Sequence, residues 1–196
     1  MTQAPASPRR FVLLDRDGTV NVERNYLSSP DQLELYPGVG PALRRLSELG
    51  FGIAVVTNQS GVARGYFDLE MLSKVHERLT ELLAAEGVTL DGIYICPHSP
   101  EDDCRCRKPL PGMVEQAVAE HGFDPKLAFL VGDKALDIEM GQAVGATAIL
   151  VRTGYGAKTE AAENCAPAVV VDDLPAAAAW IERMVGTAQT ARSTAS

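Results

Sequence analysis

The chain has 196 residues, enough for one sizeable hydrophobic core but few for two full domains, so we predict a single α/β domain with elaborated loops. Hydrophobic residues make up 46% of it, charged residues 22% and aromatic residues 6%, which excludes a disordered or collagen-like chain. The net charge of −8 argues against a general binder of nucleic acid or anionic membranes, and no apolar run approaches the roughly 20 residues that cross a bilayer.

The two ends of the chain differ in composition from the rest. Residues 1–10 are rich in Pro, Ala and Ser, and residues 186–196 lack apolar periodicity. We therefore predict two disordered tails around one domain at residues 11–185. The first ten residues also lack the apolar centre of a signal peptide, which favours a cytoplasmic location, and we expect a monomer.

Short apolar runs recur along the chain and predict buried strands. We place these strands at residues 11–14, 53–56, 93–95, 127–131, 148–151 and 168–171. Between them, apolar residues recur at helical spacing in four segments, and each segment ends at a glycine that can adopt the left-handed conformation of a helix end. The four glycines are Gly50, Gly87, Gly122 and Gly145.

Alternating strands and helices predict right-handed crossovers and a three-layer, Rossmann-like parallel sheet with helices on both faces. Ligands bind such sheets beyond the carboxyl ends of the strands, so polar side chains should gather there. The residues that follow four of the runs are Asp15 and Asp17, Thr57 and Asn58, Cys96 and His98, and Asp133. About forty residues separate Asp17 from Thr57, too few for a large cap domain beside the predicted loop and helix.

Asp15 and Asp17 leave the first apolar run and lead into a glycine. If the extended backbone continues, side chains two residues apart point the same way, so both carboxylates face one pocket. A divalent cation relieves their repulsion, and magnesium commonly takes one or two carboxylates together with water and substrate phosphate. Taken alone, the pair is equally typical of an acidic turn that caps a strand, and only its position favours the metal site.

Three later segments carry groups suited to a phosphorylated ligand. The hydroxyl of Thr57 and the N–H groups after it can hold phosphoryl oxygens, although such a polar run is also typical of a turn. Lys108 can neutralise a transferring phosphoryl group and Arg107 can grip a second anion, unless the two form a merely exposed basic pair. Asp133 can complete a magnesium shell, with Asp137 one helical turn on, and can equally cap a helix.

Four residues of metal-ligand type fall within eleven positions: Cys96, His98, Cys104 and Cys106. Three thiolates and one imidazole are what a closed tetrahedral zinc site takes, and this density disfavours a loop with incidental cysteines. The closed ligand set indicates a structural role, in which zinc ties down the loop at residues 96–106 before Arg107 and Lys108. His76 lies in a helical segment and is expected to be a surface residue rather than a ligand.

Taken in order, four segments resemble the motifs of the haloacid dehalogenase superfamily: DRDGT at residues 15–19, VVTNQSG at 55–61, CRKP at 106–109 and VGDKALD at 131–137. More narrowly, LDRDGT, TNQSGVARG, DGIYICPH, CRCRKPLPGM and VGDK followed by ILVRTG resemble a group within it. That group comprises the bacterial D-glycero-D-manno-heptose 1,7-bisphosphate 7-phosphatases and the related histidinol-phosphate phosphatases. The resemblance covers about residues 11–154, most of the chain.

This resemblance implies a phosphatase that works through an aspartyl-phosphate. By resemblance, Asp15 is the nucleophile, and Asp17 protonates the leaving group and then deprotonates water. Magnesium is bound by Asp15, the backbone carbonyl of Asp17 and Asp133. Thr57 and Lys108 stabilise the phosphoryl oxygens, and Asp137 orients the lysine.

The resemblance also implies the substrate, heptose 1,7-bisphosphate, which loses its C7 phosphate on the route to nucleotide-activated heptose for surface glycans. Arg107 would then recognise the distal phosphate, and Lys134 would contact substrate or waters at the metal site. Some relatives have a longer stretch between His98 and Cys104, a difference that can alter selectivity. The residues assigned to the sugar pocket are Glu23, Arg24, Asn25, Tyr26, Thr57, Asn58, Gln59 and Ser60.

Two alternatives stay open. Histidinol phosphate is the nearest rival substrate, because its phosphatases share the four motifs and the zinc loop; another small sugar phosphate is a variant of the same alternative. The other possibility is a non-catalytic, zinc-stabilised binding module. Such a module would be expected to lack at least one of the four central residues, and this chain has them all: Asp15, Asp17, Lys108 and Asp133.

Overall fold

A computed structural model gives the structure of residues 9–193, with the backbone alone described for residues 187–193. Six strands form one sheet in the order β3-β2-β1-β4-β5-β6, and every neighbouring pair is parallel, as predicted. The strands are β1 (Phe11–Leu14), β2 (Gly52–Asn58), β3 (Gly92–Cys96), β4 (Phe129–Gly132), β5 (Thr147–Val151) and β6 (Val169–Val171). β4 begins two residues later than predicted because Pro125–Leu127 forms a short 3-10 helix, η2.

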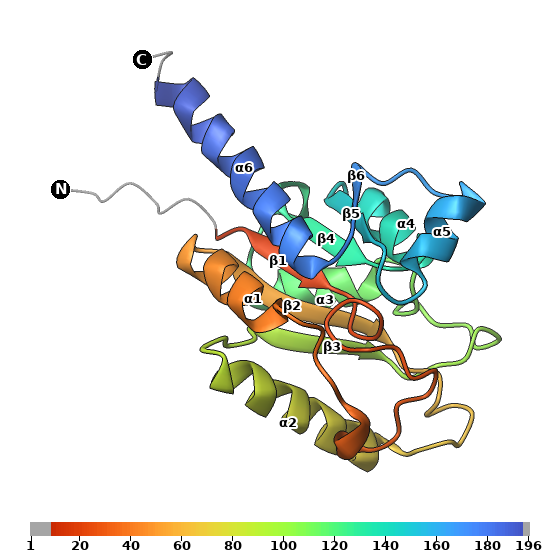
Figure 1. Cartoon of the computed structure of the whole chain (residues 1–196). Helices are drawn as coiled ribbons and strands as arrows, with labels where there is room; N and C mark the ends of the chain where they lie inside the picture. The colour runs from red at the N-terminus through yellow and green to blue at the C-terminus, as the bar shows by residue number, and fades with distance from the viewer. Residues whose placement is uncertain (1–8, 194–196) are drawn as a thin grey trace.

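Helices cover both faces of this sheet (Figure 1). α1 (Val39–Glu48), α2 (Leu69–Ala85) and α6 (Leu174–Ser193) pack on the face to which Val12 and Leu14 of β1 point. α3 (Gly112–His121) and α4 (Ala135–Ala143) pack on the opposite face, with α3 and Met140 of α4 against Phe11 and Leu13. Successive residues of a strand point to opposite faces, so a central strand covered on both sides is apolar throughout.

The four predicted helices end where the sequence indicated. Gly50, Gly87, Gly122 and Gly145 have φ angles of 86°, 77°, 67° and 77°, in the left-handed region that a residue with a Cβ rarely adopts. Each glycine therefore stops a helix and turns the chain into the next segment. Two further elements complete the described chain, η1 (Pro30–Gln32) and α5 (Gly156–Ala162).

The sequence prediction missed α5 and α6. α6 begins after Asp173, whose carboxylate accepts a hydrogen bond from the Ala176 N–H at 2.8 Å, and it buries Leu174 and Ile181. Because extending an anchored helix costs far less than starting one, the backbone stays helical to Ser193. The predicted disordered tail at residues 186–196 is therefore wrong as far as Ser193, and residues 194–196 lie outside the described residues.

The predicted N-terminal tail also extends two residues too far into the domain. Arg9 pairs with Asp91 and donates a hydrogen bond to the Phe51 carbonyl at 3.0 Å, and the Arg10 guanidinium lies 4.7 Å from the Phe51 ring centre. These contacts tie residues 9 and 10 to the domain, so the predicted boundary at residue 11 moves back by two residues. Residues 1–8 of the predicted tail lie outside the described residues.

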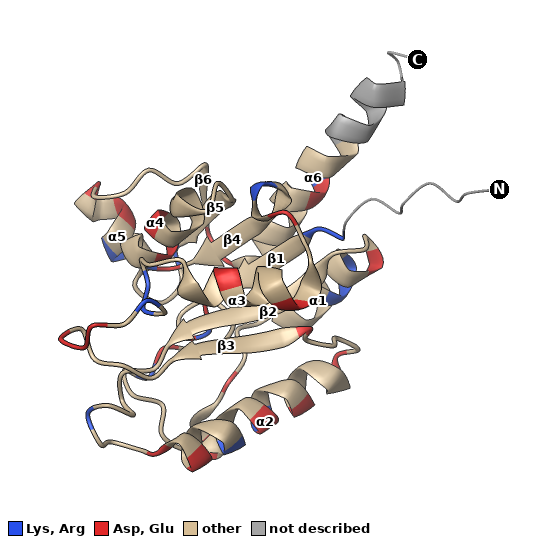
Figure 2. Cartoon of the chain, turned by 180° about the vertical axis from the view of Figure 1, so that it is seen from behind, with Lys and Arg blue, Asp and Glu red and all other residues tan. Residues whose placement is uncertain are grey.

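The outer surface of the helices is polar. Along α2, Lys74 pairs with Glu70 and Arg78 with Glu81, and charges of both signs follow the helix (Figure 2). None of the helices in the described part of the chain is long and apolar enough to cross a membrane. Within residues 9–193 the segments between strands hold single helices and loops, and none forms a separate cap domain over the carboxyl ends of the strands.

Candidate active site

A cavity of about 330 Å³ opens at the carboxyl ends of β1, β2 and β4, where the strand order predicts a ligand site. Its walls come from the ends of these strands, from the loops after β1 and β3, and from the first turn of α4. Most of the residues predicted from the sequence meet here. The lining residues are Asp15, Asp17, Glu23, Asn25, Tyr26, Thr57, Asn58, Gln59, Ser60, Gly61, Arg107, Lys108, Lys134, Leu136, Asp137 and Tyr155.

The floor of the cavity holds a buried ion cluster. The Lys108 ammonium lies 2.7 Å from Asp15 Oδ1 and 2.6 Å from Asp137 Oδ1, and all three side chains are almost inaccessible to solvent. Burial opposes the charge on Lys108, but the two carboxylates outweigh it and raise its pKa. Burial likewise opposes the charge on Asp15, but Lys108 and Lys134 outweigh it and lower the pKa of Asp15. Asp15 therefore presents a charged carboxylate.

Two contacts fix the position of Lys108. Its backbone N–H donates to Asn58 Oδ1 at 3.1 Å, which ties the loop after β3 to the end of β2. Asp137 stands in the first turn of α4, where its Oδ2 accepts the Lys134 N–H at 3.0 Å while its Oδ1 faces the lysine. The same carboxylate thus caps the start of α4 and orients Lys108, whereas Asp133, which the sequence offered as a helix cap, precedes the cap residue Lys134.

Asp17 lies beside Asp15 and accepts hydrogen bonds from three side chains. The Arg16 guanidinium donates through Nη2 at 2.8 Å, Asn21 Nδ2 at 3.0 Å and Gln59 Nε2 at 2.9 Å. Gln59 Nε2 also donates to Thr57 Oγ1 at 2.9 Å, which links the Asp17 carboxylate to the end of β2. The Asp17 side chain is 14% exposed, so one side of it remains open to the cavity.

Asp133 is fully buried at the end of β4. Its Oδ2 accepts the Tyr155 N–H at 2.8 Å, whereas its Oδ1 accepts no hydrogen bond from the described residues. Gly18 and Gly154 both have positive φ and press against this carboxylate, and a Cβ on either would collide with Oδ2. Burial and the nearby Asp15 raise the pKa of Asp133 to about 8.

Three oxygens converge on one point beneath the cavity. The Lys134 ammonium lies 3.3 Å from Asp133 Oδ1, 3.7 Å from Asp15 Oδ2 and 3.4 Å from the Asp17 carbonyl oxygen. Burial opposes the charge on Lys134, but Asp15 and Asp133 outweigh it and raise its pKa. A cation of this chain thus already contacts the oxygens that the sequence assigned to magnesium. A set of oxygens in which the buried Asp133 Oδ1 accepts no hydrogen bond from the described residues fits such a hard ion.

The loop after β1 forms the outer wall, with one exception to the prediction. Glu23, Asn25 and Tyr26 line the cavity, but Arg24 pairs instead with Glu34 at 2.7 Å. The next residue, Asn25, has a φ of 62°, in the left-handed region. Placing Arg24 in the sugar pocket was therefore wrong.

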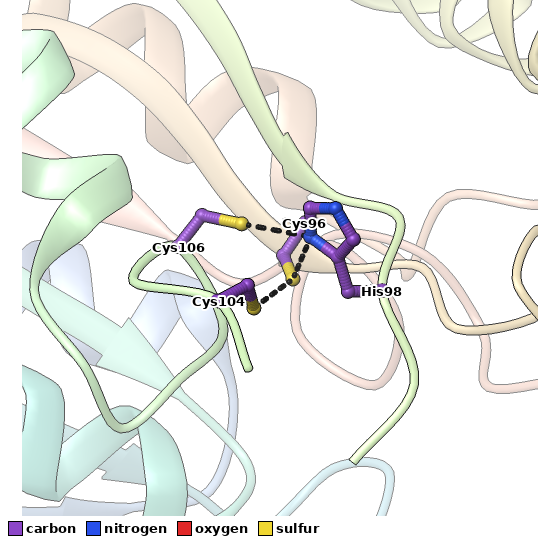
Figure 3. Close-up of side chains that lie close together, drawn as sticks. All are labelled: Cys96, His98, Cys104 and Cys106. Carbon is purple, nitrogen blue, oxygen red and sulfur yellow. Dashed lines mark hydrogen bonds between the residues drawn. The ribbon is translucent and has the colours of Figure 1, made fainter. Parts of the chain in front are cut away.

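A second cluster lies on the loop that leads to Arg107 (Figure 3). Its four side chains point toward one another, with Cys96 Sγ 3.7 Å from His98 Nδ1 and 3.8 Å from Cys104 Sγ, and His98 Nδ1 3.2 Å from Cys106 Sγ. These atoms can hold a metal ion. Arg107 Nη1 donates to the His98 carbonyl at 3.0 Å, so this cluster and the cavity share one short loop.

The sequence prediction missed several residues around the site. Tyr155 lines the cavity and follows β5, so the rule that places ligands after strands indicated it. Asn21 and Arg16 hold Asp17, and no periodicity pointed to either. His76 was expected at the surface, but its Nε2 lies 2.9 Å from Arg16 Nη1, in a half-buried position.

Comparisons with known proteins identify a family model and several relatives that are similar to this chain. A HAD-hydrolase-like family model matches residues 105–177, the segment that carries Lys108, Asp133 and Asp137. D-glycero-beta-D-manno-heptose-1,7-bisphosphate 7-phosphatase of Pseudomonas aeruginosa is 42% identical over 171 residues, which cover 87% of this chain and 96% of that protein. The enzyme of the same name from Yersinia pestis is 46% identical over 151 residues, covering 73% and 80%.

A solved structure is similar over nearly the whole domain. It is the D,D-heptose 1,7-bisphosphate phosphatase of B. bronchiseptica, described as complexed with magnesium and phosphate. Its TM-score is 0.85 at 37% identity, and the match covers 89% of this chain and 99% of that one.

Magnesium binding to the metal-free protein is expected to weaken as the pH falls below about 8. In that state Asp133 holds a proton below its raised pKa of about 8, and this proton must leave before the oxygen can bind a cation. The apparent dissociation constant should therefore rise by up to about tenfold per pH unit below about 8. Calorimetry in two buffers of different ionisation enthalpy measures both the affinity and the protons released. An affinity that is constant across this range would contradict the assignment.

Proposed function

Because the chain belongs to the family of D-glycero-D-manno-heptose-1,7-bisphosphate 7-phosphatases, haloacid dehalogenase-like hydrolases, we propose that it removes the C7 phosphate of that bisphosphate at the Asp15 cavity. The observation that carries this proposal is the Asp15 carboxylate, held charged by Lys108 at the floor of a polar cavity, with Asp17 beside it. A non-catalytic module would have no use for this buried charge.

In the first step an oxygen of Asp15 attacks phosphorus in line with the bond to the sugar oxygen. The new bond forms an aspartyl-phosphate, the bond to the sugar oxygen breaks, and Asp17 gives its proton to the leaving alkoxide. Lys108 and the Thr57 hydroxyl face the phosphoryl oxygens and stabilise the charge that they carry. Asp137 keeps the Lys108 ammonium in position.

In the second step water replaces the sugar. Asp17, now unprotonated, takes a proton from a water molecule that attacks phosphorus, and the bond from phosphorus to the Asp15 oxygen breaks. Phosphate leaves, Asp15 regains its carboxylate and Asp17 regains its proton. One residue thus serves as acid and then as base, which requires its carboxylate to keep one orientation through both steps.

Magnesium would be held by Asp15, the Asp17 carbonyl oxygen and Asp133. Bound there, it would neutralise phosphoryl charge and draw the nucleophile and the phosphoryl group together. Lys134 contacts the same three oxygens, so it would release them to the ion, and its ammonium would then be available to the substrate.

Zinc is the metal that best fits the Cys96 cluster. A tetrahedral zinc site with Zn–S bonds of about 2.3 Å places its sulfur ligands about 3.8 Å apart. The 3.8 Å between Cys96 Sγ and Cys104 Sγ matches that edge, and the 3.7 Å from Cys96 Sγ to His98 Nδ1 is close to it. All four positions are protein ligands, which supports a structural role rather than catalysis at this metal.

The distal phosphate at C1 is assigned to Arg107, a half-buried cation that lines the cavity beside Lys108. Its planar guanidinium suits bidentate contact with a phosphate. Glu23, Asn25 and Tyr26 line the part of the cavity that a sugar would face, and Asn58, Gln59 and Ser60 add further lining from the end of β2 and the loop after it. The relatives' activity supports a place in nucleotide-activated heptose synthesis, while a cytoplasmic location and a monomeric state remain predictions from the sequence.

A substrate panel tests this function. With magnesium supplied, kcat/KM for heptose 1,7-bisphosphate is expected to exceed that for fructose 1,6-bisphosphate and histidinol phosphate by at least about tenfold, because only the heptose matches both the sugar wall and Arg107. Phosphate release measures each rate. A preference for histidinol phosphate would overturn the choice of substrate and leave the mechanism intact.

The same panel tests Arg107 when it is repeated with Arg107→Ala. The KM for a bisphosphate should rise about tenfold or more, whereas the KM for a monophosphate should stay within about twofold, because only the former has a second anion to lose. Equal effects on both substrates would remove the assigned role.

Asp15→Asn is expected to lower kcat by about 10⁴-fold or more, because an amide cannot form the acyl phosphate. Phosphate release and trapping of the phosphorylated enzyme measure the loss, and circular dichroism checks the fold. Asp31→Asn, the same change at an exposed carboxylate outside the cavity, is the matched control and should keep full activity. Substantial turnover by Asp15→Asn would exclude this nucleophile.

Purified protein should contain about one zinc per chain, and a chelator that removes it should lower activity without touching the catalytic residues. The expected reason is that the loop carrying Arg107 and Lys108 loses its anchor. Elemental analysis, thermal melting and recovery of activity on adding zinc in the presence of magnesium measure this effect. Full activity in zinc-free protein would contradict the structural role.

A further inference from the structure

Arg16 stands between the two catalytic carboxylates in sequence and is completely buried. Its Nε and Nη2 both reach the two oxygens of Asp17, with four distances between 2.8 and 3.2 Å. This fork-to-fork contact fixes the plane of the carboxylate as well as its distance. The orientation of Asp17 therefore depends on the orientation of one guanidinium.

That guanidinium is held from its other side by α2. Arg16 Nη1 lies 2.9 Å from Nε2 of His76, a residue 60 positions further along the chain. The helix that carries His76 is itself anchored, because Val75, Leu79 and Leu83 on its inner face are buried in the core against the sheet. His76 thus connects the Asp17 carboxylate to a rigid element outside the cavity.

The chemistry of the His76 ring suits this contact. Burial and, after it, the adjacent Arg16 cation lower its pKa to about 3, although Asp17 acts in the opposite direction. A neutral imidazole has one nitrogen that accepts a hydrogen bond, and Arg16 can only donate. His76 Nε2 is therefore the acceptor, and Nδ1 carries the proton.

We propose that Arg16 and His76 are positioning residues for Asp17: His76 holds the Arg16 guanidinium, which in turn holds the carboxylate in the orientation that serves the leaving oxygen. This inference rests on the acid and base role of Asp17 in the proposed function. A buried ion pair alone is weak evidence for stability, because desolvation offsets much of its attraction. The Arg16–Asp17 ion pair, in contrast, orients the catalytic acid, and this function accounts for its presence.

The leaving group separates this role from a general effect on folding. A sugar alkoxide needs a proton as it departs, whereas p-nitrophenolate is stable without one, and kcat/KM reports only the steps through the first phosphoryl transfer. His76→Leu is therefore expected to lower kcat/KM for heptose bisphosphate about tenfold but that for p-nitrophenyl phosphate by less than about twofold. Partial unfolding would lower both equally.

Three variants make the comparison specific. His76→Gln keeps a side-chain acceptor and should restore most of the loss with the sugar substrate. Ser73→Ala lies one turn earlier on α2, does not contact Arg16 and should change neither rate by more than about twofold. Arg16→Lys keeps the charge but loses the fork, so it should show the same selective loss even if His76→Leu proves unstable in thermal melting.

Asp17→Asn separates the acid role of Asp17 from the positioning role of Arg16 and His76. If this variant lowers kcat/KM equally for both substrates, the acid role within the proposed function fails. If it loses about 100-fold more on the sugar phosphate, while His76→Leu and Arg16→Lys lose nothing or lose equally on both substrates, the positioning role alone is overturned. Selective losses in all three support the inference.

Discussion

The contact on which the site depends is the one between the Lys108 ammonium and the carboxylates of Asp15 and Asp137, all buried. Removing these charges from water is costly, and any one of them left alone would be strongly unfavourable. Together with Asp133 and Lys134, the cluster has three acids and two bases, so it carries one excess negative charge once Asp133 has lost the proton that its raised pKa of about 8 retains. A divalent cation and a phosphate dianion can therefore enter as a nearly balanced pair, whereas either alone would disturb the charge balance.

This balance requires elements distant in sequence to meet within hydrogen-bonding distance. Asp15 follows the central strand β1, Asp137 opens α4, and Lys108 arrives on a loop from the edge strand β3. An edge strand has a neighbour on one side only, so its following loop has the least support from the sheet. The Cys96 cluster and the Asn58 contact supply that support immediately before and at Lys108. The Cys96 cluster, which can hold a metal ion, and the buried charges around Lys108 are therefore joined through one short loop.

Much of this could be predicted from the sequence because it depends on backbone rules. Apolar runs gave the strands, glycines the helix ends, and the positions after strands the residues Asp15, Thr57 and Asp133. The residues that the sequence prediction missed or misplaced depend instead on loop and tertiary contacts. Arg24 pairs with Glu34 outside the cavity, a contact between loop residues that no periodicity indicates. The Arg16 contact with His76 joins residues 60 apart, and only the packing of α2 brings them together.

Gly18 and Gly154 leave no space beneath the Asp133 carboxylate, which rests on bare backbone from two separate loops. A side chain resting on other side chains shifts whenever a neighbour is replaced, but one resting on main chain does not. The loops around the cavity can therefore diverge widely in sequence, and acquire new substrate preferences, without moving the atom that the chemistry needs fixed. Because Gly18 and Gly154 have no side chains beneath Asp133, the loops at the rim of the cavity can change in sequence without displacing this carboxylate.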